Sequence, residues 1–196
     1  MKTKIVCTMT GFILFFCFLI HIEKRWDNMI YVKSNINGIG YRVRKINDAQ
    51  LAADLLGETH LKMKEICNIL KNNHPDDQRV IRLVERFPNT SLAESDGYGS
   101  QTSYSINKGE KIVLCLRAKD GSNKLVDKNL LLFVALHEMS HIMTISIGHE
   151  DEFWTNFKFM LKESQNSGLY KCINFSSTPQ SYCGMTVTST PFPCDG

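Results

Sequence analysis

The chain has 196 residues, of which 43% are hydrophobic, and its formal net charge is +3. Such a composition is typical of a globular protein, and a small net charge without a dense basic tract gives no electrostatic footprint for nucleic acid. We therefore expect no nucleic-acid partner, and a length that suffices for one folded domain beyond an amino-terminal segment.

The amino-terminal segment is apolar from residue 5 to residue 22, with Lys2 and Lys4 before it and Glu23, Lys24 and Arg25 after it. Its length is at the lower edge of what crosses a bilayer, and no small-residue cleavage site follows. We expect residues 1–25 to be an uncleaved signal anchor with one transmembrane helix, rather than a cleaved signal peptide. The predicted location is thus a membrane, through a single span.

The orientation of that span is left open by the flanking charges, which are basic on both sides. Glycosylation sequons begin at Asn89 and Asn174, and three cysteines lie in the carboxyl-terminal tail. These features favour an external or lumenal domain, in which Cys172, Cys183 and Cys194 should include a disulfide pair.

The next segments predict a stem, two helices and a hairpin. Residues 26–46 show no strong periodicity, and we interpret them as a juxtamembrane stem. Residues 47–73 have apolar positions at helical spacing, with Asp48 as a possible cap, and Pro75 is expected in the first turn of a second helix. Residues 89–100 are expected to be a surface loop. Residues 102–106 and 111–116 predict two short strands joined by a turn.

A buried helix with a metal-binding pattern follows. Asp127 is a suitable cap, and residues 129–136 are apolar on almost every side, which is typical of a buried helix. Residues 137–141 read His-Glu-Met-Ser-His, the HExxH pattern. His137 and His141 are four residues apart, so both rings lie on one helix face and can bind one metal ion. Glu138 lies between them and can act as a general base.

A catalytic zinc ion needs a third protein ligand and an open position for water. His149, directly after Gly148, is the best candidate because the chain should turn back there. A carboxylate from Glu150, Asp151 or Glu152 is the alternative. These acidic residues also begin a predicted helix, which leads to a loop-like tail at residues 168–196. Five cysteines lie beyond the anchor, so at least one is left without an intrachain partner.

The run Ile112-Val113-Leu114-Cys115-Leu116-Arg117, the HExxH pattern and the later Gly-His-x-x-x-Phe-Trp resemble the WLM and SprT-like zinc metallopeptidases. The resemblance covers residues 80–165. It implies a zincin fold, one zinc ion bound by His137, His141 and His149, and Glu138 as catalytic base. Seven residues separate His141 from His149, where WLM members have five. The amino-terminal anchor and the stretch Tyr182-Cys183-Gly184-Met185 resemble membrane-anchored relatives predicted in large DNA viruses.

The resemblance also implies that the strand at residues 111–117 borders the substrate, which makes Leu114 and Leu116 candidate substrate-binding residues. Tyr182 and Tyr170 are candidates to stabilise an oxyanion from the tail. We thus expect an α+β zincin-like domain at residues 47–167, with a small antiparallel sheet, acting as a zinc metalloendopeptidase on peptide or protein substrates. The alternative is a non-enzymatic membrane or envelope protein that uses this fold as a structural or binding module, with Cys172 or Cys183 as a fourth ligand.

Overall fold

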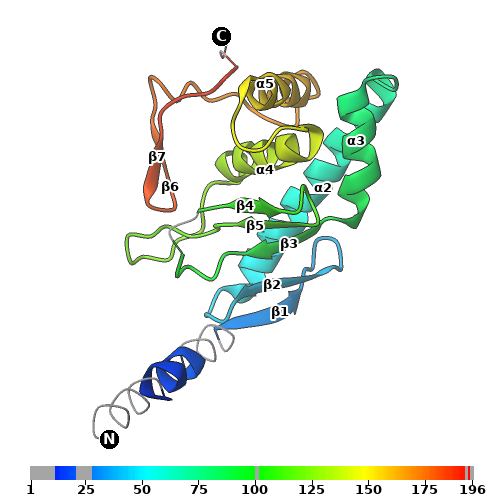
Figure 1. The fold of residues 1–196 in the computed structure, drawn as a ribbon. Coiled ribbons are helices and arrows are strands. Elements are labelled where there is room, and N and C mark those ends of the chain that lie inside the picture. Colours follow the sequence, from blue (N-terminus) through cyan, green and yellow to red (C-terminus); the bar gives the residue numbers. More distant parts are fainter. Residues whose placement is uncertain (1–11, 21–27, 100–101, 193, 195–196) are drawn as a thin grey trace, which may run out of the picture.

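The structure, a computed structural model, describes residues 12–20, 28–99, 102–192 and 194. Its helices between residues 49 and 166 pack on a five-stranded sheet, the helix at residues 12–20 projects away from the domain, and a two-stranded hairpin stands apart from the sheet (Figure 1). In chain order the elements are β1 (Met29–Lys33), β2 (Gly40–Arg44), α2 (Ala49–Asn73), α3 (Gln78–Arg86), η1 (Phe87–Asn89), β3 (Ser91–Glu94), β4 (Tyr104–Ile106), β5 (Lys111–Leu114), α4 (Lys128–Met143), α5 (Asp151–Asn166), β6 (Gln180–Tyr182) and β7 (Met185–Val187).

The sheet is mixed, with strand order β1-β2-β3-β5-β4. The outer pairs β1–β2 and β5–β4 are antiparallel, whereas β2–β3 and β3–β5 are parallel. The predicted α+β class is confirmed, but the prediction of a purely antiparallel sheet is wrong. The β2–β3 pair is parallel because α2 and α3 connect the two strands as a crossover, whereas β4 lies between β3 and β5 in the chain.

Two of the strands lie in a segment that we expected to be a stem. Tyr41 and Val43 of β2 are buried in the core, and β1 pairs with β2 along its whole length. Residues 29–44 are therefore part of the folded domain. Likewise β3 lies inside the expected loop at residues 89–100. These strands are too short for their alternation to stand out from the flanking polar residues.

The helices of the domain begin close to the predicted positions, with two differences. Asp48 precedes α2 but its carboxylate pairs with the buried Arg117 guanidinium at 2.6 Å instead of capping the helix. α3 begins at Gln78, with the Asp77 side chain accepting a hydrogen bond from the Arg79 amide, so Pro75 lies before the helix. Arg117 also pairs with Glu94 at 2.7 Å, which fastens the ends of β3 and β5 to the start of α2.

The amino-terminal prediction is corrected. In the part of the chain that the structure describes, no helix is both long enough and apolar enough to span a membrane, so the prediction of a single-pass membrane location is wrong. Residues 12–20 are helical, and the remaining residues of the predicted span, 5–11 and 21–22, lie outside the described residues.

Candidate metal centre and cleft

The HExxH residues lie on the last two turns of α4, at the centre of the domain. The helix starts where the Asp127 side chain accepts hydrogen bonds from the amides of Asn129 and Leu130. It packs against α2, α3, α5 and the β4–β5 side of the sheet, so most of its surface is buried. His137 and His141 lie one turn apart, with ring centres separated by 5.0 Å. The helical spacing thus puts both rings on one face of α4, and the packing of the helix holds them in place.

His149 completes a cluster of three histidines. The chain leaves α4 after Met143 and turns back at Gly148, whose φ of +84° favours glycine. The Nε2 atom of His149 comes within 3.0 Å of Nε2 of His137, and one ring nitrogen of each histidine lies within 4.8 Å of the others. Nitrogen ligands at about 2.0–2.1 Å from a tetrahedral zinc ion would be about 3.3 Å apart. The three histidines therefore fit one zinc ion.

Charged side chains hold the loop that carries His149. Lys108 Nζ donates to the carbonyl oxygens of Thr144 (3.0 Å), Ile145 (3.2 Å) and Ser146. The Glu152 carboxylate accepts hydrogen bonds from the amides of Ile145 and Ser146, each at 2.9 Å, and these bonds lower its pKa to about 2. Glu152 is thus committed to the backbone of the loop. The described metal-ligating cluster contains no carboxylate, so the geometry favours His149 over Glu150, Asp151 and Glu152 as third ligand.

Burial determines the protonation of the central groups. It lowers the pKa of His137 to about 3, with further contributions from His141 and His149, and it lowers that of His141 to about 4. Both rings are then neutral at pH 7 and can offer a lone pair to a metal ion. Burial also raises the pKa of Glu138, which is only 4% exposed, to about 8. A divalent cation at the histidines would favour the carboxylate form.

Two aromatic residues of α5 orient the histidines, and the sequence analysis did not assign them this role. The Phe153 ring stacks on His141 at 4.3 Å between centres and meets His137 edge-on at 4.7 Å. Phe157 meets His137 at 5.2 Å. Phe153 follows His149 by four residues. The helical periodicity of the segment that became α5 was therefore the one signal in the sequence that could have placed Phe153 near the histidines.

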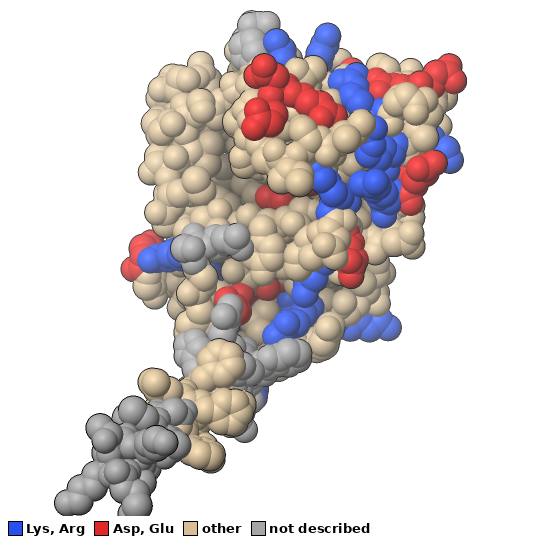
Figure 2. All heavy atoms as spheres, viewed as in Figure 1, with Lys and Arg blue, Asp and Glu red and all other residues tan. Residues whose placement is uncertain are grey.

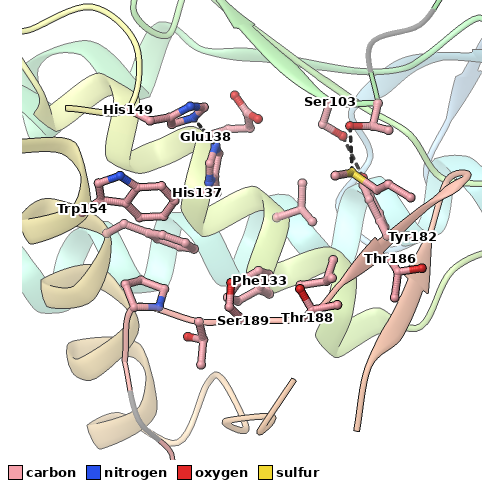
Figure 3. Close-up of a pocket in the computed structure, with 17 residues that line it drawn as sticks. Ser103, Phe133, His137, Glu138, His149, Trp154, Tyr182, Thr186, Thr188 and Ser189 are labelled. Carbon is pink, nitrogen blue, oxygen red and sulfur yellow. Dashed lines mark hydrogen bonds between the residues drawn. The ribbon is translucent and has the colours of Figure 1, made fainter. Parts of the chain in front are cut away.

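A cleft opens on both sides of the histidine cluster. A cavity of about 690 Å³ lies on one side and a cavity of about 450 Å³ on the other, and Ser103, His137, Glu138 and His149 line both. In the close-up of the larger cavity, Glu138 and the histidines stand at one end and Phe133 at the other (Figure 3). Glu138 therefore lies where the two cavities adjoin.

The strand that borders the cleft is β4, not β5. Leu114 and Leu116 are both 0% exposed and lie in the core, so neither lines the cleft. The physical reason is that β4 pairs with the outer side of β5 and becomes the edge of the sheet. Tyr104 and Ser105 of β4 line the smaller cavity.

Tyr182 lines the larger cavity, but its hydroxyl is engaged in a closed set of hydrogen bonds. The Cys115 amide donates to Ser103 Oγ (3.0 Å), Ser103 Oγ lies 2.7 Å from the Tyr182 hydroxyl, and that hydroxyl donates to the Cys115 carbonyl (2.8 Å). Burial raises the pKa of Tyr182, and an oxyanion would have to displace one of these bonds. Tyr170 is buried beside Phe133 and lines none of the cavities described here.

Two disulfides fasten the carboxyl-terminal segment. Cys172 pairs with Cys194 inside the tail, while Cys115, which directly follows β5, pairs with Cys183. Cys183 and Gly184 have φ of 51° and 85° and form the two-residue turn between β6 and β7, which gives the stretch at residues 182–185 its structural role. Cys67 is buried and free. Neither Cys172 nor Cys183 is therefore available as a fourth metal ligand.

Comparisons with known proteins identify relatives. The family model described as WLM domain matches residues 41–191, which include α4, His149 and the β6–β7 hairpin. An uncharacterised protein of Acanthamoeba polyphaga mimivirus is 28% identical over 192 residues, covering 95% of this chain and 97% of its own. An uncharacterised protein of Invertebrate iridescent virus 3 is 42% identical over 85 residues, covering 43% of this chain and 48% of its own. Wss1 from Saccharomyces cerevisiae has a TM-score of 0.49 at 20% identity, covering 65% of this chain and 90% of that structure.

Proposed function

The chain belongs to the WLM domain family, and from this premise we propose that it is a zinc-dependent endopeptidase with its active site in the cleft along α4. The observation that carries the proposal is the convergence of three histidine nitrogens beside a buried glutamate. His137, His141 and His149 offer one ring nitrogen each within 4.8 Å of one another, and Glu138 lines both cavities next to them.

The roles of the residues follow from their positions. When bound, a zinc ion supplies a Lewis acid that polarises the scissile carbonyl and lowers the pKa of a water molecule. The three histidines hold the ion as neutral ligands. Glu138 accepts the proton of the attacking water and passes it to the leaving amine nitrogen. The exposed edge of β4 offers backbone groups to a peptide that lies extended in the cleft.

A purely structural metal site is the competing function. Such a site would fill the fourth position with a protein ligand. Cys172 and Cys183, the candidates for that position, are both in disulfides. A structural site would also need no general base, whereas Glu138 is buried next to the histidines and lines both cavities. These features favour the peptidase.

The proposal is tested by removing and restoring the metal. The full chain is stripped with a chelator, dialysed, and assayed on an unfolded protein substrate during titration with zinc. We expect cleavage to fall by at least about 100-fold on stripping and to return at one equivalent of zinc, as expected for a metal that activates the nucleophile. Cleavage that is equal in stripped and zinc-loaded samples would refute the proposal.

A further inference from the structure

The larger cavity has walls from three parts of the fold. Phe133 and Val134 of α4 form its floor, four and three residues before His137 and so about one helical turn from it. Trp154 and Phe157 of α5 form one side. Residues 185–191, in and after β7, complete the lining, with Thr186 across from Trp154 and with Thr188 and Ser189 beside Phe133 in the close-up (Figure 3). The cavity therefore begins at the proposed catalytic residues and extends away from them between α5 and the carboxyl-terminal segment.

Away from Glu138 and the histidines, the lining is uncharged and combines apolar side chains with the hydroxyl groups of serines and threonines. Among the described residues that line this cavity, none is a lysine, arginine or aspartate, and Glu138 is the one carboxylate. The space-filling view agrees, since the lobe over β6 and β7 is without charged side chains on the face shown, while lysines and arginines gather over α3 (Figure 2). A charged side chain placed in this cavity away from Glu138 would lose hydration and meet no group of opposite charge.

The size and the ring content of the cavity indicate a large occupant. Its volume of about 690 Å³ lies in the range of about 300–1,000 Å³ that is usual for ligand pockets. The rings of Phe133 and Phe157 lie 5.2 Å apart at its base, and Trp154 is 43% exposed at its side. Aromatic side chains prefer such offset and edge-on contacts with other rings.

The wall formed by residues 185–191 is held in place covalently. The Cys115–Cys183 disulfide joins the β6–β7 hairpin to the end of β5, and the Cys172–Cys194 disulfide closes the segment beyond it. The Tyr182 hydroxyl adds a hydrogen bond to the Cys115 carbonyl at 2.8 Å. A pocket with fixed walls discriminates between side chains by shape as well as by polarity.

We infer that this cavity is the main specificity pocket of the cleft, and that it selects substrates with a large aromatic side chain adjoining the scissile bond. The inference rests on the proposed peptidase function. Small side chains would leave the pocket unfilled, and acidic or basic side chains would be excluded by desolvation.

The test is a set of peptides that differ at one position next to a single cleavable bond, with Phe, Ala or Asp there. The full-length zinc-loaded protein should cleave the Phe peptide at least about tenfold faster in kcat/KM than the Ala peptide, with cleavage sites read by mass spectrometry. Thr188→Trp, which fills the pocket from its wall, should reduce that ratio to below about twofold. Ser181→Trp is the matched control, since Ser181 is exposed on the same hairpin but does not line the cavity.

A binding arm separates this inference from the proposed function. In the Glu138→Gln variant, the indole resonance of Trp154 is followed by NMR during titration with the Phe and Ala peptides. A shift of this resonance with the Phe peptide alone supports the pocket. If the wild-type protein then cleaves neither peptide, the proposed peptidase function fails but the pocket inference stands. Equal cleavage of both peptides, or a Trp154 resonance that responds to neither, would overturn the inference.

Discussion

The Nε2 atoms of His137 and His149 lie 3.0 Å apart, although the two residues are twelve positions apart in the chain. When both rings are neutral, the two facing nitrogen atoms can be arranged in two ways. Either one carries a hydrogen atom and the other a lone pair, or both carry a lone pair. A shared zinc ion, as proposed above, would use both lone pairs.

His149→Ala should therefore weaken zinc binding while leaving the fold intact, because the side chain is exposed and lies outside the core. We expect the zinc affinity to fall by at least about 100-fold, measured by competition with a chromophoric chelator; even loss of residues that only support ligands costs about 10–100-fold. His74→Ala is the control, since His74 contacts Glu163 on α5 and takes no part in the cluster. An unchanged zinc affinity in His149→Ala would remove His149 from the ligand set.

Lys108 lines the smaller cavity beside the histidines and positions the loop that carries His149, but it is not one of the three clustered ligands. Its amino group bonds to the carbonyl oxygens of Thr144, Ile145 and Ser146, so Lys108→Met removes three contacts from the loop. We expect zinc affinity to fall by about 10–100-fold, as is usual when residues that orient ligands are lost. The thermal unfolding midpoint of the zinc-free protein should change little. Lys64→Met, at an exposed position of α2, is the control and should leave zinc affinity unchanged.

The Cys115–Cys183 disulfide links positions 68 residues apart and should stabilise the fold strongly. Replacing both cysteines with serine should lower the free energy of unfolding by about 2–5 kcal/mol, measured by denaturant titration. The replacement should also loosen the β6–β7 hairpin, so the preference for aromatic substrates should decrease more than overall cleavage. The comparison is a variant in which Cys172 and Cys194 are replaced with serine, and it should lose less stability. A larger loss in that variant would contradict the prediction.

Arg117 is buried between two carboxylates, with Glu94 only 3% exposed. Arg117→Met should destabilise the domain by about 3–5 kcal/mol, because it leaves the Glu94 carboxylate buried without its partner. The double variant Arg117→Met with Glu94→Leu should recover part of that loss, since it removes the unpaired charge. Equal stability of the single and double variants by denaturant titration would argue against a role for the ion pair.

Local patterns predicted much of the fold and of the site. α2, α4 and α5 are long and have clear apolar periodicity, and the HExxH pattern places two rings on one helix face through spacing alone. β4 and β5 were predicted because a turn-forming stretch separates two short β-prone runs. The sequence predicted His149 as the best of several candidate third ligands, because only a short loop separates it from the HExxH helix.

Other features depend on contacts between distant residues. β1, β2 and β3 are short and partly exposed, and their pairing is decided by the rest of the sheet. The order of strands, which puts β4 rather than β5 at the edge, cannot be read from either strand alone. The Cys115–Cys183 pair and the Ser103–Tyr182 contact join residues 68 and 79 positions apart, for which a single sequence offers no local signal.

The most direct test of the account is the rate of peptide cleavage by the Glu138→Gln variant, with zinc content determined on the same sample. The account predicts one zinc ion per chain in both the wild-type protein and the variant, because Glu138 is not a ligand. It predicts a loss of cleavage of about 10²–10⁴-fold or more in the variant, because the general base is gone. A zinc-loaded variant that cleaves as fast as the wild-type protein would contradict the account.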